Sequence, residues 1–143
     1  MNDYGPTGYW YTVQDKKPVN KLEALSGPAL RTFFNIAEHW QLSTEQQRIL
    51  LGNPARSTFF QWKKKGDGIL SKDTLERISY ILGIYKALQI LLPQADAADA
   101  WIKRPNTAPL FHGSSALDRM LSGNVADLYI VRQYLDAERG GHA

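Results

Sequence analysis

Seven polar and basic side chains within ten residues are the groups of this sequence best suited to bind another molecule. They lie in the stretch RSTFFQWKKK and comprise Arg56, Ser57, Thr58, Gln61, Lys63, Lys64 and Lys65. An arginine can form two hydrogen bonds with a guanine edge, a glutamine can do the same with an adenine, and small hydroxyl side chains can reach bases or phosphates. Lysines supply the cations that phosphate contacts require. The residue types and their order predict a surface that contacts nucleic acid.

The segment around these residues predicts how they are positioned. Ser43 and Gln46 form a capping box, so a short helix begins there and continues to Leu50–Leu51. Gly52 ends that helix, the chain turns through Asn53–Pro54, and a second helix carries the polar and basic residues. Two helices joined by a tight glycine-containing turn are typical of a DNA-binding helix-turn-helix. Two alternatives remain: a helical hairpin whose lysines are merely solvated, and an RNA-binding surface, although the aromatic platform of single-strand binders is missing.

The spacing of apolar residues predicts helices throughout the chain after residue 25, and the expected fold class is all-α. An amphipathic helix is expected from Pro28 to Trp40, with the proline in its first turn. Ser71 should cap a longer helix that ends before Pro93. Further helices are expected over residues 94–103, after a capping box of Ser115 and Asp118, and from a cap at Asn124 and Asp127 to about Arg139. The apolar stripe expected on the long helix consists of Leu75, Ile78, Leu82, Tyr85, Leu88 and Leu92.

Composition and charge exclude several classes of protein. The 143 residues carry a net charge of +3 and no cysteine, so a disulfide framework, a cysteine-ligated zinc and a thiol nucleophile are impossible. Residues 43–77 contain seven basic and four acidic residues, whereas residues 113–143 contain three basic and four acidic ones, so the basic excess lies on the helix-turn-helix. The three histidines lack metal-binding spacing, and no catalytic or cofactor-binding motif appears. We therefore expect a cytoplasmic protein that is not an enzyme, has no cofactor, metal or membrane segment, and starts with no signal peptide.

The first 24 residues predict an irregular arm. Glycines and prolines interrupt a group of aromatic residues there, with a short extended piece possible at Tyr9–Val13. One helix-turn-helix makes few contacts with DNA, so we expect a homodimer. Candidate dimer contacts are the aromatic residues Tyr9, Trp10 and Tyr11 of the arm and the apolar stripe around Tyr85 and Leu88.

The end of the chain adds a resemblance to these physical arguments. The sequence PNTAPLFHGSSALDRMLSGNVADLYIVRQYL, which follows a helix-turn-helix and a long helix, resembles the C-terminal module of the Xre/MbcA/ParS family of antitoxins. The matching positions are Pro105, Asn106, Leu110, Gly113, Ser115, Leu117, Leu121, Gly123 and the final helix. The chain departs from the family pattern at Ala116, where a proline is common, and at Phe111–His112. The resemblance covers residues from about 25 to 140.

This resemblance implies a type II antitoxin that represses its own operon and blocks a RES-type toxin acting on NAD. It divides the chain into the arm (1–24), a helix-turn-helix domain (25–92) and a toxin-binding module (93–143). The tail is slightly acidic and could occupy the cationic groups of a cofactor cleft; the candidate toxin-binding residues are Asp127, Tyr129, Ile130, Tyr134, Asp136 and Glu138. The alternative is a stand-alone repressor whose C-terminal half dimerises or senses a ligand. From the residues alone, the tail could equally be the closing element of the core.

Overall fold

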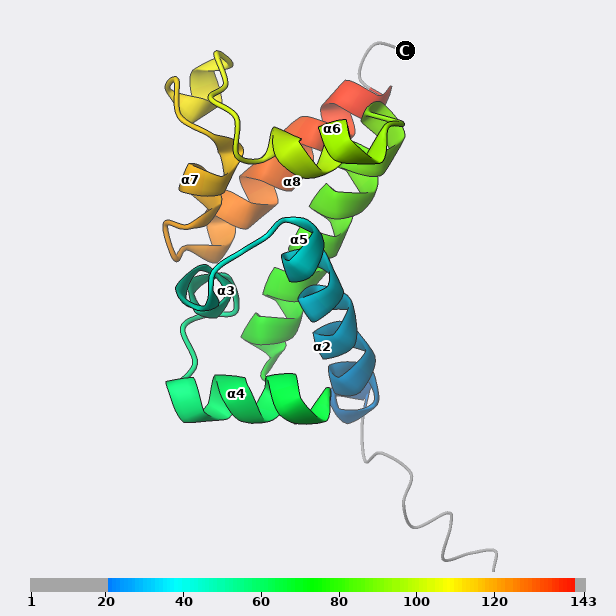
Figure 1. The fold of residues 1–143 in the computed structure, drawn as a ribbon, viewed down its shortest axis with the longest axis vertical. Helices are drawn as coiled ribbons and strands as arrows, with labels where there is room; N and C mark the ends of the chain where they lie inside the picture. The colour runs from blue at the N-terminus through cyan, green and yellow to red at the C-terminus, as the bar shows by residue number, and fades with distance from the viewer. Residues whose placement is uncertain (1–20, 141–143) are drawn as a thin grey trace, which may run out of the picture.

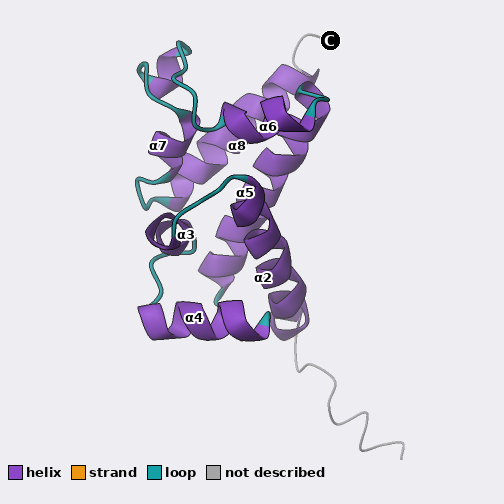
Figure 2. Cartoon of the chain, viewed as in Figure 1, coloured by secondary structure: helices purple, strands orange, loops and turns teal. Residues whose placement is uncertain are grey.

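The computed structural model describes residues 21–140, and this part of the chain is all-α, as predicted (Figure 2). Within it, β-pairing is limited to one isolated bridge between Pro105 and Ser115. The predicted extended piece at Tyr9–Val13 and the aromatic dimer contacts of the arm lie outside the described residues. In chain order the elements are α2 (Lys21–His39), α3 (Thr44–Leu50), α4 (Arg56–Lys65), α5 (Lys72–Leu91), α6 (Ala95–Trp101), the short 3-10 helix η1 (Pro109–Phe111), α7 (Ala116–Met120) and α8 (Val125–Gly140).

Helix α2 begins seven residues before the predicted start, and Pro28 lies inside it. The prediction of an irregular segment as far as residue 24 is therefore wrong for residues 21–24. A proline in a helix removes one backbone hydrogen bond, which normally favours a helix start at that point. Here a tertiary contact stabilises the preceding turn, because the buried Ser26 hydroxyl accepts a hydrogen bond from the Leu70 backbone N–H at 3.1 Å. The Pro28 side chain itself is exposed, so its ring displaces no core residue.

The predicted helix-turn-helix segment forms as expected from its caps and its glycines. Ser43 and Gln46 make the capping box of α3, and Ser71 caps α5 through the Thr74 backbone N–H. Gly52, at a φ of 95°, ends the α3 region, and Gly66 closes α4 in the left-handed conformation. A side chain is strained in that conformation, whereas glycine adopts it readily. The turn between the two helices is thus fixed by local sequence.

Helix α5 is the centre of the molecule, and its apolar surface is wider than the single predicted stripe. It packs against α2 on one side and, most extensively, against α8 on another. Its fully buried apolar residues are Ile78, Ile81, Ile84, Ala87 and Leu88. The predicted stripe contained only two of these, because one amphipathic face cannot describe a helix covered by two neighbours. The prediction that the apolar stripe around Tyr85 and Leu88 forms a dimer contact is wrong at Leu88. That residue is only 1% exposed within a single chain, so it is not available to a second copy.

The C-terminal helices follow the predicted order with one difference at the start of α8. Ser115 and Asp118 form the expected capping box of α7. The expected cap, in which the side chains of Asn124 and Asp127 bind backbone N–H groups at the start of α8, does not form. The Asp127 carboxylate instead accepts hydrogen bonds from Arg119 and from the Ser122 hydroxyl, and that hydroxyl accepts one from the Asn124 N–H. A charged partner from α7 is a stronger ligand for a carboxylate than a neutral backbone N–H.

The two ends of the molecule present different elements (Figure 1). Helix α4 lies across one end, beside the first turns of α2 and α5, whereas α8 finishes at the opposite end. The inner side of α8 buries Leu128, Val131 and Leu135, and these residues belong to the same core cluster as Phe59 of α4. One continuous core therefore supports both ends.

Candidate functional site

Helix α4 presents nearly all the side chains predicted to meet nucleic acid. Thr58 is half-buried, and the other six, namely Arg56, Ser57, Gln61, Lys63, Lys64 and Lys65, are exposed. Phe59 is fully buried against the ring of Phe34 and Trp62 is half-buried, as the sequence indicated. The helix thus has one anchored side and one free side that is polar and basic.

Arg56 is held in place by an acidic neighbour that the sequence analysis did not identify. Its guanidinium forms an ion pair with Glu45 of α3 and lies over the ring of Phe60, 5.4 Å from the ring centre. Glu45 also pairs with Arg48 at 2.7 Å. If Arg56 is to form two hydrogen bonds with a guanine, its ion pair with Glu45 must therefore break or be only partly kept. The separation of 11 residues between the partners gave no helical-spacing signal that could have revealed the pair.

The start of α4 differs from the starts of α3, α5 and α7. Those three helices have serine caps, whereas Ala55 precedes α4 and provides no side-chain hydrogen bond. The first backbone N–H groups of a helix have no partner within the helix, and together they favour an anion. The N-terminus of α4 is therefore a suitable position for a DNA phosphate beside Arg56.

The turn before α4 is braced by side chains from both neighbouring helices. The Arg48 Nε donates to the Pro54 carbonyl at 3.0 Å, and the Thr74 hydroxyl donates to the Leu51 carbonyl at 3.3 Å. A Cβ on Gly52 would lie 3.2 Å from both Arg77 and Asp73, which themselves form an ion pair. These contacts fix the orientation of α4 relative to α3 and α5.

We expect the Glu45→Gln variant to bind DNA more tightly than the original chain. The change removes a negative charge beside the basic side of α4 and frees Arg56, and an exposed ion pair is worth about 0.2–1 kcal/mol, so the gain should be roughly 1.4- to fivefold. Fluorescence anisotropy with a labelled DNA duplex, at two salt concentrations, measures the affinity. Glu138→Gln removes the same charge at the other end of the molecule and should change nothing. Equal affinity of Glu45→Gln and the original chain would show that Glu45 does not restrain Arg56.

The outer side of α8 carries only part of the predicted toxin-binding set. Tyr129, Asp136 and Glu138 are exposed, whereas Ile130 and Tyr134 are half-buried. The Tyr134 ring packs edge-to-face on Phe111 at 5.3 Å, and burial raises its pKa, with a smaller contribution from Glu138. Asp136 lies between Arg132 at 3.5 Å and Arg139 at 3.9 Å.

Tyr129 has partners on both α5 and α8. Its ring is 5.6 Å from that of Tyr80 on α5, and its hydroxyl accepts a hydrogen bond from Gln133. The Tyr80 hydroxyl donates to Glu76, and this bond, followed by desolvation, raises the pKa of Tyr80. The Tyr80–Tyr129 pair gives this side of the molecule an aromatic surface that is still 45% exposed at Tyr129.

Asp127 is bound within the chain. Its carboxylate forms an ion pair with Arg119 at 2.9 Å, and Arg119 also donates to the Leu110 carbonyl. The Ser122 hydroxyl and the Arg119 guanidinium hold the pKa of Asp127 below its ordinary value, against the opposite effect of partial burial. This network joins η1, α7 and the first turn of α8. If Asp127 contacted a partner protein, this hydrogen-bond network would have to break or include the partner.

Neither a metal cluster nor a membrane span is found in the part of the chain that the structure describes. Residues 21–140 contain no group of three histidine or acidic side chains that could hold an ion. None of the helices from α2 to α8 combines the length and apolarity needed to cross a bilayer.

The fold and surfaces define a helix-turn-helix protein with an appended helical module on the same core, and comparison with known proteins identifies its family. Residues 22–83 match the antitoxin Xre-like helix-turn-helix domain, and residues 87–141 match the antitoxin Xre/MbcA/ParS C-terminal toxin-binding domain. An uncharacterised protein of Sinorhizobium fredii (strain NBRC 101917 / NGR234), y4oB, is 59% identical over 112 residues, which cover 78% of this chain and 84% of that protein. The chain belongs to the Xre/MbcA/ParS family of antitoxins, which confirms the resemblance seen in the sequence.

Proposed function

We propose that this antitoxin neutralises a RES-type toxin that acts on NAD and represses its own operon as a homodimer. The helix-turn-helix domain over residues 25–92 would read DNA, and the module over residues 93–143 would bind the toxin. The observation that carries the proposal is the position of the two surfaces on one core. Helix α4 lies across one end of the molecule and α8 extends to the opposite end, so one chain could hold DNA at α4 and toxin along α8 (Figure 1).

The DNA-binding part of the proposal rests on the exposed side of α4. Arg56 and Gln61 would read base edges, Ser57 and Thr58 would contact bases or phosphates, and the three lysines would contact phosphates. Two copies would read half-sites about 34 Å apart or a multiple of that distance. The part of the operator contacted by one α4 is short, which is why a dimer is required.

The toxin-binding part rests on the outer side of α8. Tyr129 and Ile130 supply an apolar anchor, and Tyr80 of α5 extends it. Of the three candidate carboxylates, Asp127 and Asp136 are paired within the chain, so Glu138 offers the freest charge to a cationic cleft. An exposed aromatic residue and an exposed acidic residue on the same helix can each contribute to a protein interface.

The test uses the full chain with changes on the outer side of α8. Removing α8 would expose the buried side of α5, so truncation would unfold the protein rather than isolate its toxin-binding function. We expect Tyr129→Ala with Glu138→Lys to weaken capture of the co-expressed neighbouring RES-type protein by at least about 30-fold, which corresponds to hot-spot energies of 2 kcal/mol or more. Cells should then lose NAD and stop growing.

Phe60→Ala is the matched control. Phe60 is 43% exposed, almost as much as Tyr129 at 45%, but it lies on α4 and not on the proposed toxin-binding helix α8. The control should leave toxin capture unchanged. Full protection of cells by the α8 variant would contradict the proposed interface. Failure of the original chain to bind any neighbouring gene product would favour the second candidate function, a stand-alone repressor with a dimerising or ligand-sensing C-terminal half.

A further inference from the structure

An apolar groove runs between α2 and α5, which lie side by side in the helix-turn-helix half of the chain (Figure 1). Its lining includes Leu25, Ala29, Ile78 and Leu82, and the described residues that form it are all uncharged. Its volume is about 290 Å³, at the lower limit of the roughly 300–1,000 Å³ typical of small-molecule sites. The groove therefore suits apolar side chains better than a cofactor.

Two strongly exposed apolar side chains lie at one end of this groove. Leu25 is 53% exposed and Ile69 is 75% exposed. Each is followed in the sequence by a member of one hydrogen-bonded pair, because the Leu70 backbone N–H donates to the Ser26 hydroxyl at 3.1 Å, so Leu25 and Ile69 lie at the same end of the groove. A continuous apolar surface on a soluble protein usually marks a contact site. The groove and this end of it therefore form a docking surface.

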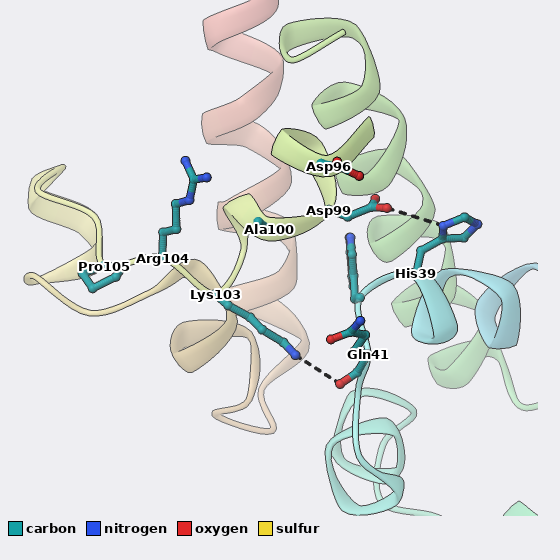
Figure 3. A pocket seen from close by; sticks show the side chains of 9 residues that line it. His39, Gln41, Asp96, Asp99, Ala100, Lys103, Arg104 and Pro105 are labelled. Carbon is teal, nitrogen blue, oxygen red and sulfur yellow. Dashed lines mark hydrogen bonds and ion pairs between the residues drawn. The ribbon is translucent and has the colours of Figure 1, made fainter. Parts of the chain in front are cut away.

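The pocket at the other end of α2 has a different chemical character (Figure 3). In its lining His39 Nδ1 pairs with Asp99 Oδ2 at 3.5 Å, and Lys103 Nζ donates to the Gln41 carbonyl at 3.1 Å. These polar groups join the end of α2 to α6 and the residues that follow it. An apolar segment placed there would remove water from charged groups, which is unfavourable, so the groove between α2 and α5 is the better place for such a segment.

The first part of the chain contains a segment that matches this groove in chemistry. Residues 4–14 contain four aromatic side chains and one valine but no charged side chain. Three of the aromatic residues, Tyr9, Trp10 and Tyr11, are consecutive. An aromatic side chain that leaves water buries about 150–250 Å², while a tyrosine hydroxyl or an indole N–H can stay at the edge of the contact. An uncharged aromatic segment therefore complements an uncharged apolar groove.

The same segment is within reach of the groove because it is joined to one of the helices that form it. Helix α2 begins at Lys21, so Leu25 lies about 6 Å along its axis and Thr32, the last residue that α2 adds to the lining, lies about 16 Å along it. Residues 14–20 can span at most about 23–25 Å. They include Pro18 and Asn20, which favour a turn back towards α2. A short tether also gives the segment a high effective concentration at the groove, which a second copy or another protein lacks.

We propose that the aromatic segment Tyr9–Tyr11 docks into the groove between α2 and α5 of its own chain. Its rings cover the exposed side of Leu25 and the apolar lining, and they contact both helices at once. The three aromatic residues are then contacts within one chain and not contacts between two copies. The docked segment adds to the packing of α2 on α5, and it depends on neither toxin nor DNA.

The experiment attaches a nitroxide spin label to the full ¹⁵N-labelled chain through Thr12→Cys. The natural chain has no cysteine, so the label has a single site. A large excess of the unlabelled original chain removes the effect of contacts between copies. We expect the label to reduce the amide signals of Ala29, Leu75 and Leu82 by more than about half, while the signal of Thr107, in the loop before η1, keeps its intensity. A second sample carries the spin label on unlabelled chains and ¹⁵N on the others, and its groove signals should stay unchanged.

A charge placed in the groove separates docking from mere closeness along the chain. Leu25→Glu changes an exposed residue and should restore most of the lost signal at Leu75 and Leu82, because an aromatic segment would have to cover a carboxylate. Ile90→Glu is the matched control, since Ile90 is 57% exposed but lies near the end of α5 and outside the lining of the groove. It should leave the signal loss unchanged.

Three results would each overturn the proposal. The first is no selective loss of signal at the groove, and the second is a loss that persists in Leu25→Glu. The third is a loss that appears only in the sample with the two labels on different chains, which would assign the groove to the aromatic segment of a second copy.

Discussion

Replacing both Arg56 and Gln61 by alanine should abolish specific operator binding while leaving the fold intact. Each side chain is exposed on α4 and is expected to contribute about 1–3 kcal/mol through hydrogen bonds to a base, or roughly a 5- to 150-fold loss in affinity for each change. The two losses should add approximately. Gel shift and anisotropy with the operator and with scrambled DNA measure both affinity and preference.

The lysine at position 64 provides the contrasting control for this prediction. Lys64→Ala should weaken binding to operator and scrambled DNA about equally and lower the salt slope by about one, because a phosphate contact carries no sequence information. Normal operator preference in the Arg56 and Gln61 double variant would mean that α4 is not the reading helix. The free side of α4 would then be a solvated surface only.

The second large effect concerns the interface between α5 and α8. Leu128→Ala should destabilise the whole chain by about 2–5 kcal/mol, because Leu128 is 1% exposed and alanine leaves a cavity in the shared core. We expect one urea transition, in which tryptophan fluorescence and helical circular dichroism change together at a lower midpoint. Since α5 packs on both α2 and α8, the helix-turn-helix should unfold in the same transition.

Glu138→Gln is the surface control for the same helix and should change stability by no more than about 0.5 kcal/mol. A Leu128→Ala chain in which α8 unfolds at low urea while operator binding persists to high urea would contradict a single core. That result would instead support two independently stable parts, divided near Pro93.

Local sequence determined the features of this protein that depend on neighbours along the chain. The capping boxes at Ser43 and Ser115 fixed two helix starts, because a serine side chain and the residue three positions later satisfy backbone groups of the same turn. The left-handed glycines Gly52 and Gly66 fixed the ends of the reading segment. The exposure of the polar and basic residues of α4 was also predictable from local sequence. The one fully buried residue of this helix is Phe59, an apolar residue.

Tertiary structure decided whatever depends on residues distant in sequence. The early start of α2 depends on the Ser26 contact with Leu70, 44 residues away, and the two-sided burial of α5 depends on α8. The pairing of Arg56 with Glu45 and of Asp127 with Arg119 depends on where two separate helices cross. The pairing of His39 with Asp99 joins residues 60 positions apart in the sequence. Periodicity and capping describe one element at a time, so contacts between elements become visible only when the chain is folded.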